Sequence, residues 1–417
     1  MSEALSAFGP VTCGRLCEGN DEFHDRFCAV FEGGGEGYEE AVSPVVLVLC
    51  FLLQSDSTSY PPALADNSWD NTGLLLEAPF SPSNRPSNSV LLTIDLTKAV
   101  AEEAIEANCS IIVAYHPIIF RGLKSLTLAN SQQQTLLRLA SHGISVYSPH
   151  TAVDAAPGGL GDWLADIVTG SKKLSAFADD AVINKGGKTP VKEGAHDPFV
   201  DNENKGLRPT WALAHHPSSS MQTTLRLGSQ STPLTSIPHT RKPVVPQSPE
   251  LASHPGAGMG RVVHFDKPQP LPALLDRIGT GMNNPKGFPI AIPQEKDIGD
   301  ITIRSVGICA GSGGSLLGNL DVDLLFTGEM SHHEALAAIE KGQVVISLFH
   351  SNSERGFLSE VLLDQLDDQI EKEWKLLREE EADQDELKEA LADEDFDVWV
   401  SEKDRDPYGI VVLNNDV

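Results

Sequence analysis

Two short segments of the chain repeat one arrangement of a histidine and a carboxylate. The first reads His150-Thr-x-x-Asp154 and the second reads His350-Ser-x-x-Glu354. In each case a helical pattern, a glycine and an apolar strand pattern precede the histidine. The histidine therefore follows the carboxyl end of a strand, which is where open α/β sheets build ligand sites. The pattern indicates two related α/β halves that place similar residues at a sheet edge.

The same residues also fit a simpler structural role. A serine followed three residues later by an acid is typical of a capping box, which satisfies free N–H groups at the start of a helix. Ser351 with Glu354 fits this role, and so does Ser331 with Glu334. The spacing alone leaves capping and metal binding nearly equal for Glu354. His350 favours metal binding, because a helix cap has no use for an imidazole.

His116 is a further candidate ligand. It follows the apolar strand expected at residues 110–115 and precedes Pro117, whose fixed φ turns the chain and leaves the imidazole at the rim of the sheet. A lone histidine at a strand end is more often a hydrogen-bonded structural residue. Two imidazoles and two carboxylates, however, suit zinc, iron, manganese or cobalt. We predict one or two divalent transition-metal ions per chain, held by His116, Asp154, His350 and Glu354.

Weaker motifs lie elsewhere in the chain. Gly311-Ser-Gly-Gly314 follows a strand and its N–H groups could cradle an anion, but it lacks a full phosphate-binding pattern and a tight turn is the better interpretation. His332-His333-Glu is not a His-Glu-x-x-His zinc motif, because Ala337 takes the place of the last histidine. Residues expected to line the pocket or to support the ligands are Tyr115, His150, Glu329, His332 and His333.

The remaining pattern predicts the elements that position these residues. Strands alternate with helices over residues 90–147 and 261–349, which is typical of largely parallel sheets. Residues 171–255 lose this periodicity and contain ten of the 27 prolines, which indicates a flexible linker or insertion. We expect an α/β fold of two related halves with mostly parallel sheets, split by this long Pro/Ser-rich linker. The expected parts are an N-terminal extension or wrongly predicted start (1–58), a first half (59–170), the linker (171–255) and a second half with an acidic helical segment near its end (256–417).

Composition disfavours several classes of function. With 59 acidic and 31 basic residues the net charge is −28, which disfavours direct binding to nucleic acids and anionic membranes. The six cysteines form no Cys-x-x-Cys pair, as expected of a disulfide-free protein. The N-terminus is acidic, and the apolar run at residues 45–53 is much shorter than the ~20 residues of a membrane span. We expect a cytoplasmic protein, with mitochondrial and nuclear locations left open.

Several stretches together resemble the Nif-three-like (NGG-interacting factor) family, often labelled GTP cyclohydrolase I type 2. They are Asp-Asn-Ser-Trp-Asp-Asn-Thr-Gly-Leu-Leu-Leu (66–76), Ile-Val-Ala-Tyr-His-Pro-Ile-Ile-Phe (112–120), His-Thr-Ala-Val-Asp-Ala-Ala-Pro-Gly-Gly (150–159), Gly-Ser-Gly-Gly-Ser (311–315), Thr-Gly-Glu-Met-Ser-His-His (327–333) and His-Ser-Asn-Ser-Glu-Arg (350–355). The resemblance covers about residues 60–170 and 256–413. Bacterial members have His-His-Pro where this chain has Tyr115-His116-Pro117, which resembles the eukaryotic branch.

This resemblance implies further properties. The family's ligands carry over onto His116, Asp154, His350 and Glu354, with Glu354 as the bridge between two ions. A toroidal homo-oligomer, commonly a hexamer with its metal sites facing the cavity, is also implied, and the family's name implies protein partners. Because Tyr115 replaces an imidazole, one metal position is expected to bind more weakly than the other.

Two classes of function are compatible with these features. One is metal-dependent hydrolysis of a small nucleotide-like substrate by an activated water. The other is a non-catalytic metal-containing scaffold or regulator that acts through protein partners, with metal storage or delivery as a variant. The ligand set favours catalysis, whereas Tyr115 and the long linker favour adaptation to partners.

Overall fold

Two β-sheets and the helices around them form the part of the chain that the computed structural model describes, residues 60–79, 86–171, 211–214, 236–380, 392–393 and 396–413. The first sheet has the order β1-β4-β3-β2-β14 and the second has the order β10-β13-β12-β11-β9-β6. The strands of the first sheet are β1 (Gly73–Leu76), β2 (Ser89–Thr93), β3 (Ile111–Ala114), β4 (Ser145–Ser148) and β14 (Asp397–Val400). Those of the second are β6 (His239–Lys242), β9 (Arg261–Pro270), β10 (Ile290–Ala291), β11 (Thr302–Ser312), β12 (Leu324–Glu329) and β13 (Val344–Ser347).

The two sheets share one topology. In each sheet an antiparallel edge strand, β1 or β10, pairs with the last of three parallel strands, β4 or β13. Gly143 (φ 74°) and Gly342 (φ 84°) take the left-handed conformation just before β4 and β13, where a side chain would be strained. This correspondence confirms the prediction of two related α/β halves with largely parallel sheets.

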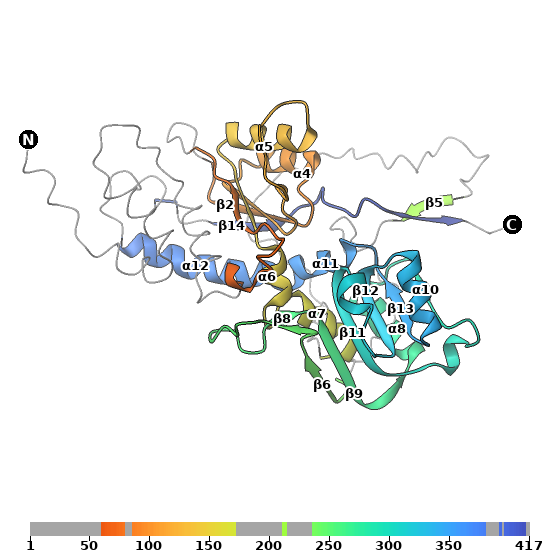
Figure 1. The fold of residues 1–417 in the computed structure, drawn as a ribbon. Coiled ribbons are helices and arrows are strands. Elements are labelled where there is room, and N and C mark those ends of the chain that lie inside the picture. Colours follow the sequence, from red (N-terminus) through yellow and green to blue (C-terminus); the bar gives the residue numbers. More distant parts are fainter. Residues whose placement is uncertain are drawn as a thin grey trace, which may run out of the picture.

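Helices cover the outer faces of both sheets and fill the space between them (Figure 1). Helices α4 (Lys98–Glu106) and α5 (Ser131–Ser141) pack on the outer face of the first sheet, and α9 (Gly314–Leu317) and α10 (His332–Glu340) pack on that of the second. The remaining helices contribute to the core between the sheets: α6 (His150–Ala155), α7 (Leu160–Thr169), α8 (Leu271–Gly281), α11 (Asn352–Phe357), a π-helical turn (Leu358–Leu362) and α12 (Leu363–Glu380).

The alternation of side chains along the strands explains these layers. In the first sheet Leu91 and Ile112 face α4 and α5, whereas their neighbours Val90 and Val113 face the central core. Successive side chains of a strand point to opposite faces, so a strand buried on both faces is apolar throughout. The central core includes residues of both sheets, and the two halves therefore fold against each other as one body.

Each predicted half contributes an element that packs with the other half, so the predicted domain boundaries do not match the packing. Strand β14 comes from the predicted second half, yet it pairs in parallel with β2 of the first sheet. Helix α7 comes from the predicted first half, yet it contacts α8 and β11. Strand β6 lies inside residues 171–255, which were assigned to the linker. It is an edge strand of half-exposed and exposed residues, so it gives no apolar signal.

The described residues also form two small two-stranded sheets. Strand β7 (Val245–Pro246) pairs with β8 (Gly258–Met259), and β15 (Ile410–Leu413) pairs with β5 (Trp211–Ala214). The predicted extension at residues 1–58 and residues 172–210 and 215–235 of the predicted linker lie outside the described residues.

Two findings concern the membrane and disulfide expectations. No helix among the described residues is both long enough and apolar enough to cross a bilayer. Cys109 and Cys309 are free thiols, and the other four cysteines lie outside the described residues. Burial raises the pKa of Cys109 to about 12, so this thiol stays protonated in the core.

Candidate metal centre

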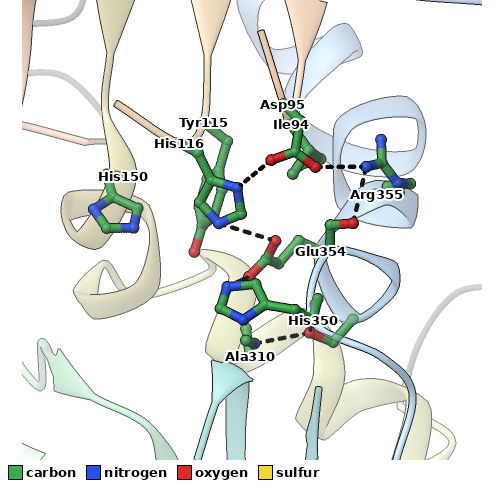
Figure 2. A network of polar contacts seen from close by, with 12 residues as sticks. Ile94, Asp95, Tyr115, His116, His150, Ala310, His350, Glu354 and Arg355 are labelled. Atoms are coloured by element: carbon green, nitrogen blue, oxygen red, sulfur yellow. Dashed lines mark hydrogen bonds and ion pairs between the residues drawn. The ribbon is translucent and has the colours of Figure 1, made fainter. Parts of the chain in front are cut away.

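Three side chains converge where the carboxyl ends of the two sheets meet (Figure 2). His116 follows β3 of the first sheet, His350 follows β13 of the second, and Glu354 lies on α11. The Nε2 atom of His116 is 3.4 Å from Oε2 of Glu354, and Nε2 of His350 is 3.7 Å from Oε1. One ligand atom from each of the three residues lies within 4.8 Å of the others. This spacing could hold a metal ion between them.

Glu354 supplies the strongest reason to expect a cation. Its side chain is 2% exposed, and its buried Oε2 atom has no hydrogen-bond partner among the described residues. A buried carboxylate oxygen without a partner is unfavourable unless a cation or a hydrogen bond compensates it. The orphaned oxygen faces an imidazole nitrogen, so the residues present fit a divalent ion with nitrogen and oxygen ligands.

The capping interpretation of Glu354 is wrong in this structure. Ser351 makes no side-chain cap on α11, because its hydroxyl donates to Oδ2 of Asp406 at 2.8 Å. Ser331 and Glu334 do form the reciprocal capping box at the start of α10. The same four-residue pattern therefore serves two purposes in the chain, and Glu354 is free to face the histidines.

A carboxylate behind each imidazole fixes the direction of the ligand atoms. Nδ1 of His116 donates to Oδ1 of Asp95 at 2.9 Å, and Nδ1 of His350 donates to Oε1 of Glu329 at 2.9 Å. A carboxylate can only accept here, so in the neutral imidazole each Nε2 keeps the lone pair that can bind a metal. Asp95 lies two residues beyond the end of β2, so its place near the end of a strand was a usable sequence signal that the prediction missed.

Charge around His116 holds a proton on it when no metal is bound. Burial alone would lower the pKa of His116, but the carboxylates of Glu354 and Asp95 raise it to about 10. The imidazolium then balances part of the negative charge of the site. A divalent cation would replace this proton, because metal ligation requires the neutral imidazole.

Asp154 lies beside this group rather than within it. It lines the same cavity, but it does not belong to the set of three whose ligand atoms lie within 4.8 Å. The hydroxyl of Tyr115 donates to its Oδ1 at 2.7 Å. Burial raises the pKa of Asp154 to about 6, close to neutrality. The hydrogen bond from Tyr115 therefore fixes the carboxylate of Asp154, the fourth candidate ligand.

The structure separates the predicted pocket residues into two groups. His150 has positive φ (30°) and lines the cavity, and its Nδ1 donates to Oδ1 of Asp70 at 2.6 Å. His332 and His333 do not line the cavity, contrary to the expectation for them. The capped start of α10 turns them to the exposed surface, where their rings contact each other with centroids 5.2 Å apart.

Gly311 allows the ligands to approach the backbone. Its φ is +58°, and a Cβ atom there would lie 2.8 Å from Oε1 of Glu354 and 2.9 Å from Nε2 of His350. Both contacts are shorter than a carbon atom tolerates. The glycine-rich segment that begins at the end of β11 thus makes room for the metal-facing side chains, whereas we expected only a tight turn there.

The fold and the site define a class of protein: two related α/β halves with a His-His-Glu group between them. Residues 53–382 match the model of the Duf34/NIF3 (NGG1p interacting factor 3) family. The chain therefore belongs to the NIF3 family, as its motifs suggested.

Curated relatives and solved structures agree with this assignment. The chain is 40% identical over 317 residues to the protein NIF3 homolog of Schizosaccharomyces pombe, covering 75% of this chain and 87% of that one. It is 33% identical over 326 residues to NGG1-interacting factor 3 of Saccharomyces cerevisiae, covering 76% and 90%. The crystal structure of a Bacillus cereus protein related to NIF3 superposes with a TM-score of 0.51 at 16% identity, covering 87% and 97%. The similarity to yeast proteins fits the eukaryotic branch.

Proposed function

We propose that the protein binds a divalent transition metal through Nε2 of His116, Nε2 of His350 and the carboxylate of Glu354. The observation that carries the proposal is the buried Oε2 of Glu354, which finds no hydrogen-bond partner in the part of the chain that the structure describes and faces Nε2 of His116 at 3.4 Å. Two imidazoles and one carboxylate match the ligand sets of zinc, iron, manganese and cobalt sites that keep open positions for chemistry.

A second ion beside Asp154 is part of the proposal, at lower affinity. Glu354 would bridge the two ions, and Asp154 would ligate the second. The hydrogen bond from Tyr115 to Asp154 supports a weaker second position, since a bound ion must compete with the phenol for this carboxylate. A neutral phenol is itself a poor metal donor near neutral pH.

The activity we propose is hydrolysis of a small nucleotide-like substrate. A divalent cation, when bound, supplies Lewis acidity that activates water or polarises a substrate oxygen. Asp154, with a pKa of about 6, can accept a proton at neutral pH, and Tyr115 holds Oδ1 of this carboxylate in place. Asp95 and Glu329 keep both imidazoles pointing into a cavity of about 750 Å³.

A second candidate is a metal-containing scaffold or regulator that acts through protein partners. The name NGG1-interacting factor of the budding-yeast relative favours it. Leu123, Leu126 and Leu128 follow β3 as exposed apolar side chains, which supports a partner surface or an oligomer contact such as the hexameric ring. The cytoplasm remains our proposal for its location.

Metal analysis of purified protein tests the metal proposal. We expect the wild type, prepared without chelator, to carry bound transition metal, and the His350→Ala/Glu354→Ala variant to lose it. The matched control is His332→Ala/His333→Ala, which removes two exposed imidazoles outside the site and should keep the metal. Equal metal in all three proteins would contradict the site.

A hydrolase screen on the metal-loaded protein, with the His350→Ala/Glu354→Ala variant as the blank, then distinguishes a catalyst from a scaffold.

A further inference from the structure

We infer that the cavity over the metal centre binds the flat ring of an uncharged substrate of the nucleoside or nucleobase class, and that Trp69 holds this ring by stacking, with Phe120 beside it at the rim. The inference rests on the proposed function and narrows it. It assigns the substrate's ring to the rim of the cavity and leaves only its reacting atoms to the metal ligands.

Two large aromatic side chains at this rim are unusually open to solvent. Trp69 is 50% exposed and Phe120 is 46% exposed, although both line the cavity. Their ring centroids are 5.9 Å apart and their planes are inclined by 45°. Phe and Trp normally bury most of their surface, so an open pair at the mouth of a cavity offers stacking surface to a ligand.

Trp69 is held in place although it is exposed. Its indole Nε1 donates to Oδ2 of Asp66 at 2.9 Å, and the backbone N–H of Asp66 donates to the hydroxyl of Thr151 at 3.0 Å. The ring also meets His150 edge to face, with centroids 5.9 Å apart. A ring that is already oriented loses little conformational freedom on binding, which favours a recognition role.

The charges of the cavity argue against a phosphorylated substrate. Among the described residues that line it, none is Lys or Arg, whereas four are acidic: Asp66, Asp95, Asp154 and Glu354. Phosphate groups are usually bound by Arg, Lys or clustered N–H groups. Arg355 is nearby, but it is buried between Asp95 and Asp404 and does not line the cavity. The lining also contains Val245, Met259 and Leu316, which suit an apolar ring face.

The rim lies within reach of the metal ligands. His150 is between Trp69 and His116, with centroids 5.9 Å and 5.6 Å away from them, and His116 is 5.2 Å from His350. A one- or two-ring heterocycle stacked on Trp69 would therefore extend over His150 toward the His-His-Glu group. Substituents of the ring, rather than a distant phosphate, would meet the metal.

Isothermal titration of zinc-loaded full-length protein tests this inference. The probes are adenosine, guanosine, cytidine and uridine, the four matching triphosphates, and ribose 5-phosphate. We expect at least one nucleoside to bind more tightly than its triphosphate and than ribose 5-phosphate. Trp69→Leu should weaken that binding at least tenfold, Trp69→Phe should restore most of it, and Leu336→Ala, an exposed residue of α10 outside the cavity, should leave it unchanged.

Zinc measured in the same samples separates this inference from the proposed function. Wild-type protein that holds no zinc would defeat the metal proposal itself. Zinc-loaded protein that binds no nucleoside, prefers triphosphates or ribose 5-phosphate, or binds equally well after Trp69→Leu would overturn the stacking site while leaving the metal centre intact.

Discussion

The imidazoles of His116 and His350 each have one carboxylate on the Nδ1 side, and both face a third carboxylate on the Nε2 side. Asp95 and Glu329 accept from the two Nδ1 atoms, while Glu354 faces both Nε2 atoms (Figure 2). At the residue scale this gives three acids for two imidazoles. Within the described residues, Asp95 is the only one of these acids that also pairs with an arginine, Arg355, at 2.9 Å. Such an excess of negative charge around a buried oxygen is consistent with a centre built for a cation.

Metal affinity should rise with pH. The pKa of His116 is raised to about 10, so below that pH the imidazole holds a proton that the metal must displace. Release of one proton predicts an affinity gain of about tenfold per pH unit between pH 6.5 and 8.5. Titration of metal-free protein with Co²⁺, followed by visible absorption, would measure it. An affinity that does not change over this range would show that His116 is not a ligand.

Removing the charge of Asp95 should weaken the site without touching a ligand. In Asp95→Asn the amide can turn its NH₂ toward Nδ1, which releases the orientation of His116. Loss of such a supporting carboxylate typically lowers metal affinity about 10- to 100-fold. Glu102→Gln, which changes a half-buried acid that pairs with Arg138 on the outer helices, is the control and should bind Co²⁺ as the wild type does. An unchanged affinity in Asp95→Asn would mean that the hydrogen bond does not position the ligand.

At the scale of elements, the repeated halves explain why the site forms at all. Strands β3 and β13 end at the line where the two sheets meet, so His116 and His350 come from opposite sides. The sequence predicted these elements well, because each is a short apolar run bounded by a glycine or a cap. The strand expected at 110–115 is β3, and Thr97 caps α4, the helix that precedes it. The edge strands β1, β6 and β10 were not predicted, since they are short and partly exposed.

Substitution of Gly311 should disturb the metal centre through the backbone. A methyl group in Gly311→Ala combines the strain of φ +58° with contacts under 3 Å to Glu354 and His350. Gly342→Ala is the matched control, since its φ is +84° and a Cβ there meets nothing within 4 Å. Both variants should lose about 1 kcal/mol of stability from backbone strain. Only Gly311→Ala should also lose metal affinity, and equal affinities in the two variants would refute the steric argument.

At the scale of the whole molecule, the chain's last described segment returns to the site from far away in sequence. Oδ2 of Asp404 accepts from the backbone N–H groups of Ile94 at 2.7 Å and Asp95 at 3.3 Å, and it pairs with Arg355. We expected this segment to belong to the second half, because no local sequence pattern indicates a hydrogen-bond partner 309 residues away. Likewise, the hydrogen bond of Tyr115 to Asp154 depends on the packed fold and not on spacing.

Loss of the Asp404 charge should destabilise the protein strongly. Both members of the Arg355–Asp404 pair are 3% exposed, so Asp404→Asn leaves a buried guanidinium with one neutralising partner fewer. Breaking a buried ion pair lowers the free energy of unfolding by about 3 kcal/mol or more. Chemical denaturation would measure it, with the exposed Glu402→Gln expected to change stability by less than about 0.5 kcal/mol. A loss below about 1 kcal/mol in Asp404→Asn would show that water already screens this pair.

Anomalous diffraction from crystals grown with Zn²⁺ or Co²⁺ tests the metal centre most directly. The structure predicts a peak bonded to Nε2 of His116, Nε2 of His350 and the carboxylate of Glu354, with bonds of about 2.0–2.2 Å. A weaker second peak beside Asp154 would add the second position. Well-ordered side chains at these three residues with no anomalous peak between them, or a peak bound only elsewhere, would contradict the assignment.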